Sequence, residues 1–286
     1  MKVKIIADST VDLTKELIEK YEIDLMPLII NLGDNAYNDG VEFNTEDIYS
    51  YVEKTGELPK TSAVNQISYY EFFKKYVDEG YEVIHFSLSS GLSVTHQNAL
   101  NAGRELDGVY VIDSESLSTG IGIQAIYASE LAKKGMSAKD IYEKVLARRS
   151  SVQASFVLDK LEYLHKGGRC SSLTLLGANL LKIKPCIEVH NGHMGVAKKY
   201  IGKFNKSVSS YVLDNLKKYN NPDNTRVFVT HTKIDPEIVE NVKTLLKDNA
   251  NFKEIIETTA GCTITSHCGP NTIGSLFYND GNENHY

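Results

Sequence analysis

The fold is decided by residues 82–93, EVIHFSLSSGLS. Glu82–Leu88 is a short run rich in apolar residues that predicts a strand, and residues 94–106 are predicted to form the helix that follows. Between them lies Ser89–Ser93, a loop of small residues. In a parallel α/β sheet, ligands bind at the carboxyl ends of the strands. A helix that starts there offers unpaired N–H groups and a positive dipole end to an anion, although simple capping of the helix by Ser93 explains the same residues.

The residues on both sides of this stretch alternate between strand and helix patterns. The expected strands are residues 3–7, 24–30, 82–88 and 109–112, and the expected helices are residues 14–21, 44–54, 66–79, 94–106, 120–134 and 137–149. Such alternation predicts a parallel sheet with helices on both faces. We therefore expect an N-terminal three-layer α/β/α domain over residues 1–150.

The second half of the chain has a different pattern. Asn191-Gly192 separates two extended runs, and this pair is the strongest short signal for a hairpin because both residues tolerate positive φ. The expected strands are residues 187–190, 194–200, 226–230, 252–257 and 273–277, and the expected helices are residues 206–218 and 236–248. This order predicts a mixed α/β domain over residues 151–286.

The composition excludes several classes of protein. The 286 residues carry 31 Lys and Arg against 37 Asp and Glu, a formal charge of −6, so the broad basic surface of a nucleic-acid-binding protein is not expected. No run approaches the ~18 apolar residues of a membrane span, and residues 1–8 lack the apolar stretch of a secretion signal. Four cysteines without a CxxC pair do not make a disulfide scaffold. We expect a cytoplasmic protein without stable membrane insertion.

Three other stretches carry side chains suited to an anionic ligand. Thr61-Ser62 is predicted to lie in a loop, where its hydroxyl groups can hold a carboxylate without adding charge. His267 is predicted to lie in a turn at residues 266–270, and Lys166-Gly167-Gly168-Arg169 forms a sharp turn with two cations. Helix capping or an ordinary surface position remains the simpler explanation of each stretch taken alone.

Motifs for other chemistries are missing from the sequence. No Walker loop, GxGxxG or HExxH occurs. Residues 91–95, GLSVT, lack the second glycine of a hydrolase elbow, so a serine hydrolase or acyltransferase using Ser93 and His267 is kept only as the enzyme alternative. The pairs His190/His193 and Cys262/Cys268 would be sparse metal ligands. We expect no catalytic residue, no metal and no cofactor.

Several short motifs, in this order, resemble those of the DegV family of bacterial fatty-acid-binding proteins. They are ADST at 7–10, TS at 61–62, SSGLSVT at 89–95, DS at 113–114, LHKGGR at 164–169, IKP at 183–185 and HCGP at 267–270. Each motif is short, but the ordered set is specific and covers nearly the whole chain. The sequence departs from the family where Cys268 replaces the usual threonine. It also lacks the arginine frequent in the basic cluster that here is Lys198, Lys199, Lys203 and Lys206.

The resemblance implies a carrier rather than an enzyme. Family members bind one long-chain fatty acid between two α/β domains and present it to a fatty acid kinase, which makes acyl phosphate for phospholipid synthesis. By this pattern Thr61 and the main-chain N–H of Ser93 hold the carboxylate, with Ser62 and His267 in the nearby polar network. The residues expected to dock the partner or to support the site are Lys166, Arg169 and Lys203.

Burial of an acyl chain is compatible with this implied role. Each buried methylene contributes ~0.8 kcal/mol, so a long chain can supply most of the affinity. Leu173–Leu181 is an apolar segment that either lines such a tunnel or belongs to the core. A lipid-sensing module would need the same pocket, so the sequence does not separate a sensor from a carrier.

Overall fold

The computed structural model describes residues 2–170 and 183–281. Its N-terminal half contains a four-stranded parallel sheet with the strand order β2-β1-β6-β7. These strands are β1 (Lys2–Asp8), β2 (Ile23–Met26), β6 (Tyr81–Ser87) and β7 (Val109–Asp113). The three-layer α/β/α arrangement predicted from the alternating pattern is confirmed.

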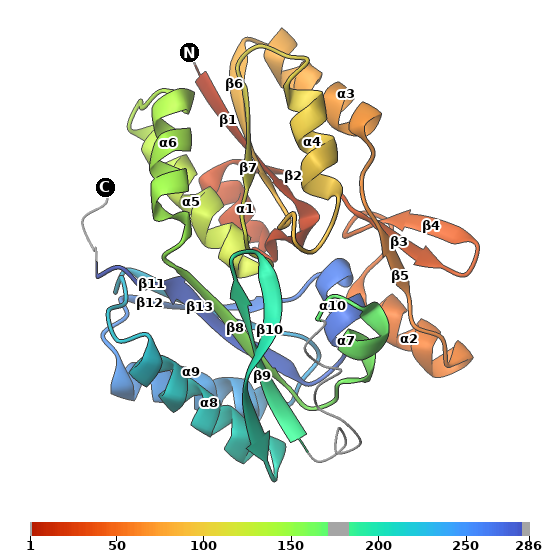
Figure 1. The fold of residues 1–286 in the computed structure, drawn as a ribbon, viewed down its shortest axis with the longest axis vertical. Helices are drawn as coiled ribbons and strands as arrows, with labels where there is room; N and C mark the ends of the chain where they lie inside the picture. The colour runs from red at the N-terminus through yellow and green to blue at the C-terminus, as the bar shows by residue number, and fades with distance from the viewer. Residues whose placement is uncertain (1, 171–182, 282–286) are drawn as a thin grey trace.

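Helices cover both faces of this sheet (Figure 1). One face carries α3 (Gln66–Asp78) and α4 (Thr95–Gly103), and the other carries α1 (Lys15–Tyr21), α5 (Thr119–Lys133) and α6 (Ala138–Arg149). Because both faces are covered, β6 is buried continuously from Val83 to Ser87 instead of alternating between buried and exposed residues.

The second half contains a six-stranded mixed sheet with the order β10-β9-β8-β13-β11-β12. Its strands are β8 (Val152–Leu158), β9 (Ile183–His190), β10 (His193–Ile201), β11 (Arg226–His231), β12 (Glu254–Thr259) and β13 (Thr272–Tyr278), and its helices are α8 (Phe204–Lys218) and α9 (Pro236–Asn249). The predicted β9–β10 hairpin is confirmed, with φ of 47° at Asn191 and 78° at Gly192. Strand β8 was not predicted.

A third, small antiparallel sheet corrects two predictions. It contains β3 (Ile29–Leu32), β4 (Asn35–Asn38) and β5 (Lys60–Ser62), and α2 (Thr45–Thr55) follows β4 in sequence. The single strand predicted over residues 24–30 is wrong, because the chain leaves β2 before Pro27, which has no N–H to donate, and enters another sheet as β3. Thr61 and Ser62 lie in strand β5, not in a loop.

Two short helices near the site were also missed. They are α7 (Glu162–Gly167) and α10 (Cys262–Cys268), so His267 lies in the last helical turn and not in the predicted turn region. Helix α10 has only seven residues, several of them β-branched, and its sequence alone has little helical propensity. The carboxylate of Asp39 stabilises its start by accepting hydrogen bonds from the N–H groups of Cys262 (3.0 Å) and Thr263 (3.2 Å).

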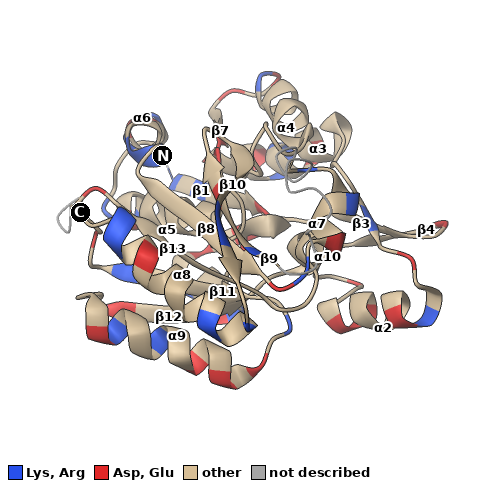
Figure 2. Ribbon diagram, turned by 60° about the horizontal axis from the view of Figure 1, so that its bottom comes forward, with Lys and Arg blue, Asp and Glu red and all other residues tan. Residues whose placement is uncertain are grey.

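One hydrophobic core connects the two halves of the molecule. It includes Ile121 and Leu117 from the first half together with Phe156 and Leu276 from the second half. The domain boundary at residues 150/151 stays a prediction. Acidic and basic residues are interspersed along exposed faces such as that of α9 (Figure 2). Across residues 2–170 and 183–281, no helix is long and apolar enough to cross a membrane, and no group of three metal-ligating side chains is found.

Candidate functional site

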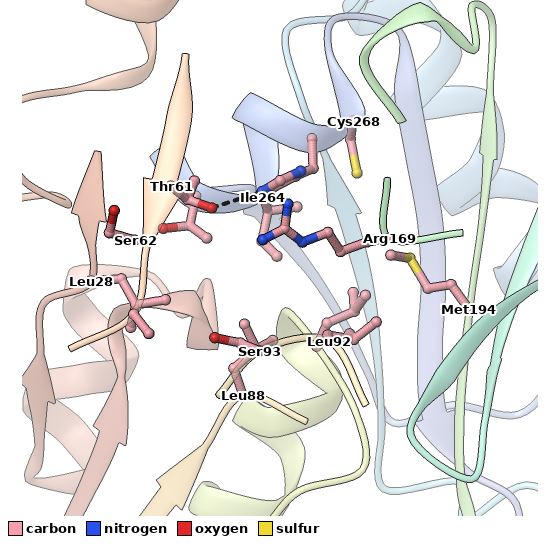
Figure 3. Close-up of a pocket in the computed structure, with 14 residues that line it drawn as sticks. Leu28, Thr61, Ser62, Leu88, Leu92, Ser93, Arg169, Met194, Ile264 and Cys268 are labelled. Carbon is pink, nitrogen blue, oxygen red and sulfur yellow. Dashed lines mark hydrogen bonds between the residues drawn. The ribbon is translucent and has the colours of Figure 1, made fainter. Parts of the chain in front are cut away.

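A pocket lies where strand β5, the loop after β6, helix α10 and strand β10 converge (Figure 3). It holds about 560 Å³ of empty space, part of it open to solvent. Its polar lining comes from Thr61, Ser93, Arg169 and His267, which lie far apart in the sequence. The other lining residues are Leu28, Ser62, Ala63, Leu88, Leu92, Leu117, Met194, Thr263, Ile264 and Cys268.

Thr61 and His267 form a pair at one wall of this pocket. Thr61 Oγ1 lies 2.9 Å from His267 Nε2. Burial, together with the nearby Arg169 charge, lowers the pKa of His267 to about 4, so the imidazole is neutral at neutral pH. His267 Nδ1 has no hydrogen-bond partner among the described residues. With the proton on Nε2, His267 donates to Thr61 Oγ1, and the Thr61 hydroxyl can donate to an anion in the pocket.

Ser93 contributes a hydroxyl group, while its main-chain N–H is already used. Ser93 Oγ accepts a hydrogen bond from the N–H of Thr95 at 3.2 Å, so its own hydrogen is available to a ligand. The Ser93 N–H donates to the carbonyl oxygen of Ser89 at 3.1 Å. This differs from the expectation that the N–H holds a carboxylate, since an anion would have to share or replace that bond. The hydroxyl is the freer donor.

Arg169 is an exposed residue that lines the pocket. Gly168 ends α7 with φ of 68°, which turns the chain so that the exposed Arg169 side chain reaches the pocket opposite Ser93 (Figure 3). Its Nη1 donates to the carbonyl oxygen of Gly167 at 2.7 Å. Among the described lining residues Arg169 is the one permanent cation, and none is Asp or Glu. The pocket is therefore suited to an anionic group.

The remaining candidate side chains are engaged elsewhere. Ser62 borders the pocket, but its Oγ accepts from Asn31 Nδ2 at 2.7 Å, because consecutive residues of a strand face opposite sides. Lys166 is exposed and paired with Glu162 at 2.8 Å, and Lys203 precedes α8 and does not line the pocket. The predicted Leu173–Leu181 lining lies outside the described residues.

A second cavity, whose empty space of about 340 Å³ is partly open to solvent, shares Leu117, Ile264 and Cys268 with the first. Its remaining lining residues are Ser118, Phe156, Thr230, His231, Thr232, Ala260, Thr272, Gly274 and Leu276. The hydroxyl groups among them are bonded to protein atoms: Ser118 to Asp12, Thr230 to Thr119 and Thr258, Thr232 to the carbonyl of Thr272, and Thr272 to the carbonyl of Cys268. Mostly hydrocarbon therefore faces the cavity.

The geometry also bears on the enzyme alternative. Ser93 and His267 both line the first cavity, but His267 Nε2 is paired with Thr61, and Ser93 Oγ is paired with the N–H of Thr95. A serine nucleophile requires a base within hydrogen-bond reach of its own hydroxyl. In this structure Ser93 Oγ and His267 Nε2 are therefore each hydrogen-bonded to a group other than one another.

Gly167 is expected to fix the position of the His267 ring. A Cβ added at Gly167 would lie 2.4 Å from His267 Nδ1. Alanine is favoured over glycine in a helix by about 1 kcal/mol, so harm from Gly167→Ala would come from this contact. We expect Gly167→Ala to push the imidazole away from Thr61 and to raise its pKa from about 4 toward the usual 6.5. NMR titration of the ring protons measures this change.

The matched control for this variant is Gly195→Ala in β10, where nothing lies within 4 Å of an added Cβ. This control should leave the His267 titration unchanged. The same titration curve for Gly167→Ala and the wild type would contradict the proposed contact.

Comparisons with known proteins agree with this architecture. Residues 2–280 match the model of the DegV family, described as uncharacterised proteins. A fatty acid-binding protein of Thermotoga maritima is 33% identical over 96% of both chains. The crystal structure of a DegV lipid-binding protein from the same organism superposes with a TM-score of 0.85 at 31% identity, covering 97% of this chain and 98% of the other. A stearic acid-binding protein of Eubacterium ventriosum superposes with a TM-score of 0.85 at 26% identity over the same shares.

Proposed function

The chain belongs to the DegV family, and from this premise we propose that it binds one long-chain fatty acid across the two cavities. The proposal rests on the chemical difference between the two cavities. Hydroxyl, imidazole and guanidinium groups line the first cavity, whereas a hydrocarbon surface lines the second. Relatives of this chain are described as binding fatty acids, including stearic acid.

The carboxylate is proposed to lie between Thr61 and Ser93. Both hydroxyl groups can donate to it, and His267 orients the Thr61 hydroxyl from behind. Hydrogen bonds to a charged group contribute about 1.5–3 kcal/mol each, which offsets the cost of taking the carboxylate out of water. The Arg169 guanidinium supplies the balancing positive charge at the mouth. Ser62 contributes to the site as part of strand β5, which positions Thr61, and its own hydroxyl does not contact the carboxylate.

The acyl chain is proposed to run from the first cavity past Leu117, Ile264 and Cys268 into the second. The lining hydroxyl groups of the second cavity already have protein partners, so a hydrocarbon chain leaves no buried polar group unpaired there. Burial of each methylene then adds about 0.8 kcal/mol of affinity.

We further propose that the chain presents this acid to a fatty acid kinase in the cytoplasm, and that the acyl phosphate formed is used for phospholipid synthesis. The first cavity is partly open to solvent and the exposed Arg169 is one of its lining residues, which supports access of a phosphoryl donor to the carboxylate end. Arg169, Lys166 and Lys203 are the candidate contacts for the kinase. Acyl-phosphate production that requires this chain, a kinase and ATP together tests this role.

The fatty-acid proposal is tested by extracting the purified protein with organic solvent and identifying the released molecules by mass spectrometry. We expect a near-stoichiometric long-chain acid. After delipidation, hexadecanoic acid should rebind at least tenfold more tightly than hexadecanol, because the alcohol has the same chain but no carboxylate for Thr61, Ser93 and Arg169. Equal affinity of acid and alcohol would contradict a carboxylate site, and neither extraction nor reloading of an acid would overturn the proposed function.

A further inference from the structure

The two cavities share three lining residues, Leu117, Ile264 and Cys268, and the boundary that these residues form is here called the throat. Resting on the proposed function, we propose that Cys268 determines chain-length selectivity, because its side chain controls how far an acyl chain can pass into the second cavity. A chain that stops at the throat fills only the first cavity. A longer chain gains affinity only by passing Cys268.

The backbone around Cys268 is held firmly in place. Its carbonyl oxygen accepts a hydrogen bond from Thr272 Oγ1 at 3.1 Å. Gly269, the next residue, has φ of 68°, and its Cα lies so close to the Tyr163 ring that an added Cβ would be 2.5 Å from Tyr163 Cδ2. At the other end of α10, Asp39 holds the first N–H groups. These contacts hold α10 at both ends, so we expect the volume of side chain 268 to set the width of the throat.

The sulfur of Cys268 makes this proposal testable without breaking other contacts. Cys268 is 5% exposed, and its Sγ has no hydrogen bond to any residue that the structure describes. Substitutions there change volume and remove no polar pair. Cys268 also follows His267 directly on α10, so the carboxylate end and the throat are placed by one rigid element. The length of chain between them is therefore fixed.

The expected signature is the dependence of affinity on chain length. Each methylene buried beyond the throat contributes about 0.8 kcal/mol, which is about fourfold in Kd. For the wild type, titration calorimetry with saturated acids from octanoic to octadecanoic should give a steady fourfold gain per methylene until the second cavity is full. For Cys268→Phe, affinity should stop increasing once the acyl chain is long enough to reach the throat. Four methylenes denied to hexadecanoic acid would cost about 200-fold in affinity.

Controls separate a blocked throat from a damaged protein. Cys268→Ala opens the passage and should keep the full gain per methylene, whereas Cys268→Leu, a smaller insertion than Phe, should stop it in the same way. The affinity of each variant for octanoic acid is the reference from which its chain-length dependence is measured, and urea denaturation shows whether its fold is intact. A full chain-length gain in both Cys268→Phe and Cys268→Leu overturns the proposal.

A second measurement uses the unaltered protein. Methyl methanethiosulfonate is a small apolar thiol reagent, and peptide mass spectrometry reports its reaction at each cysteine. Bound hexadecanoic acid should slow labelling of Cys268 at least tenfold and octanoic acid should not, while Cys186, in another core, is unaffected by either. Labelling of Cys268 in the free protein is expected to be slow, because burial raises the pKa of its thiol to about 12. Equal protection by both acids contradicts the proposal. If the wild type binds no acid, the proposed function itself fails. If the wild type binds acids and the variants keep the same dependence of affinity on chain length, only the role of Cys268 fails.

Discussion

The double variant Thr61→Val/Ser93→Ala is expected to bind a long-chain fatty acid at least about 100-fold more weakly than the wild type, because each lost donor to a charged group costs about 10-fold to 100-fold. Valine keeps the shape of Thr61, so the apolar surroundings stay filled. Titration of delipidated protein with hexadecanoic acid measures the effect. Of the two single variants, Thr61→Val should lose more, since it also leaves His267 Nε2, 2.9 Å away, without its partner.

The control for this pair is Ser62→Ala. Ser62 is the neighbour of Thr61 on β5, and its hydroxyl accepts from Asn31 instead of facing a ligand. We expect less than a threefold change in affinity. The double variant retaining wild-type affinity would remove both hydroxyl groups from the site. A loss in Ser62→Ala as large as in Thr61→Val would assign the effect to the strand and not to the Thr61 hydroxyl.

The second large effect concerns Asp12, whose substitution should change how stability depends on pH. Asp12 is buried between the two halves, accepts hydrogen bonds from Ser118 Oγ and from the N–H of Gly261, and its pKa is raised to about 8, chiefly by burial. The folded state thus holds a proton that the unfolded state releases near the ordinary aspartate pKa of 3.8. This contribution to the free energy of unfolding is full below pH ~4 and falls as the pH rises to ~8, by up to about 1.4 kcal/mol per pH unit.

Asp12→Asn should remove this slope, because asparagine does not titrate and tolerates the φ of 49° at this position. Urea denaturation of the wild type and the variant at several pH values measures it, and the variant should become the more stable of the two as the pH rises toward 8. Asp34→Asn, in the exposed β3–β4 turn, is the matched control. Parallel stability curves for the wild type and Asp12→Asn would contradict the raised pKa.

The elements predicted correctly from the sequence are those specified by local patterns. Helix α2 was predicted with its start at Asn44, and the structure confirms that Asn44 and Asp47 form a capping box. The β9–β10 hairpin follows from Asn191-Gly192 in the same way. The error at residues 24–30 has the opposite origin. No local sequence pattern shows that β2 and β3 belong to different sheets, because strand pairing depends on residues elsewhere in the chain. Ile23 of β2 pairs with Ile5, and Ile30 of β3 pairs with Thr61.

In the site, too, local motifs were predictable from the sequence, whereas geometry that depends on distant contacts was not. The motifs containing Thr61, Ser93 and His267 were identified, and the structure places all three around one cavity. Their detailed geometry was not predictable. Helix α10 depends on the Asp39 carboxylate, which is 223 residues from Cys262 in the sequence. The use of the Ser93 N–H by Ser89 depends on how the loop closes, and the reach of Arg169 into the pocket depends on the left-handed turn at Gly168.

The contact between Thr61 and His267 spans 206 residues of sequence. A ribosome that has just released β5 must still add the 206 residues from Thr61 to His267 before the imidazole exists, so this wall of the pocket is completed long after β5 is made. Closing so long a loop costs conformational entropy, and this cost is offset only by the contacts that α10 makes when it docks. A bound acid, present at 100 times its Kd, would return about 2.7 kcal/mol to the docked state. By the proposed function, the bound acid stabilises the docked state of α10, and the protein without it is expected to be less stable.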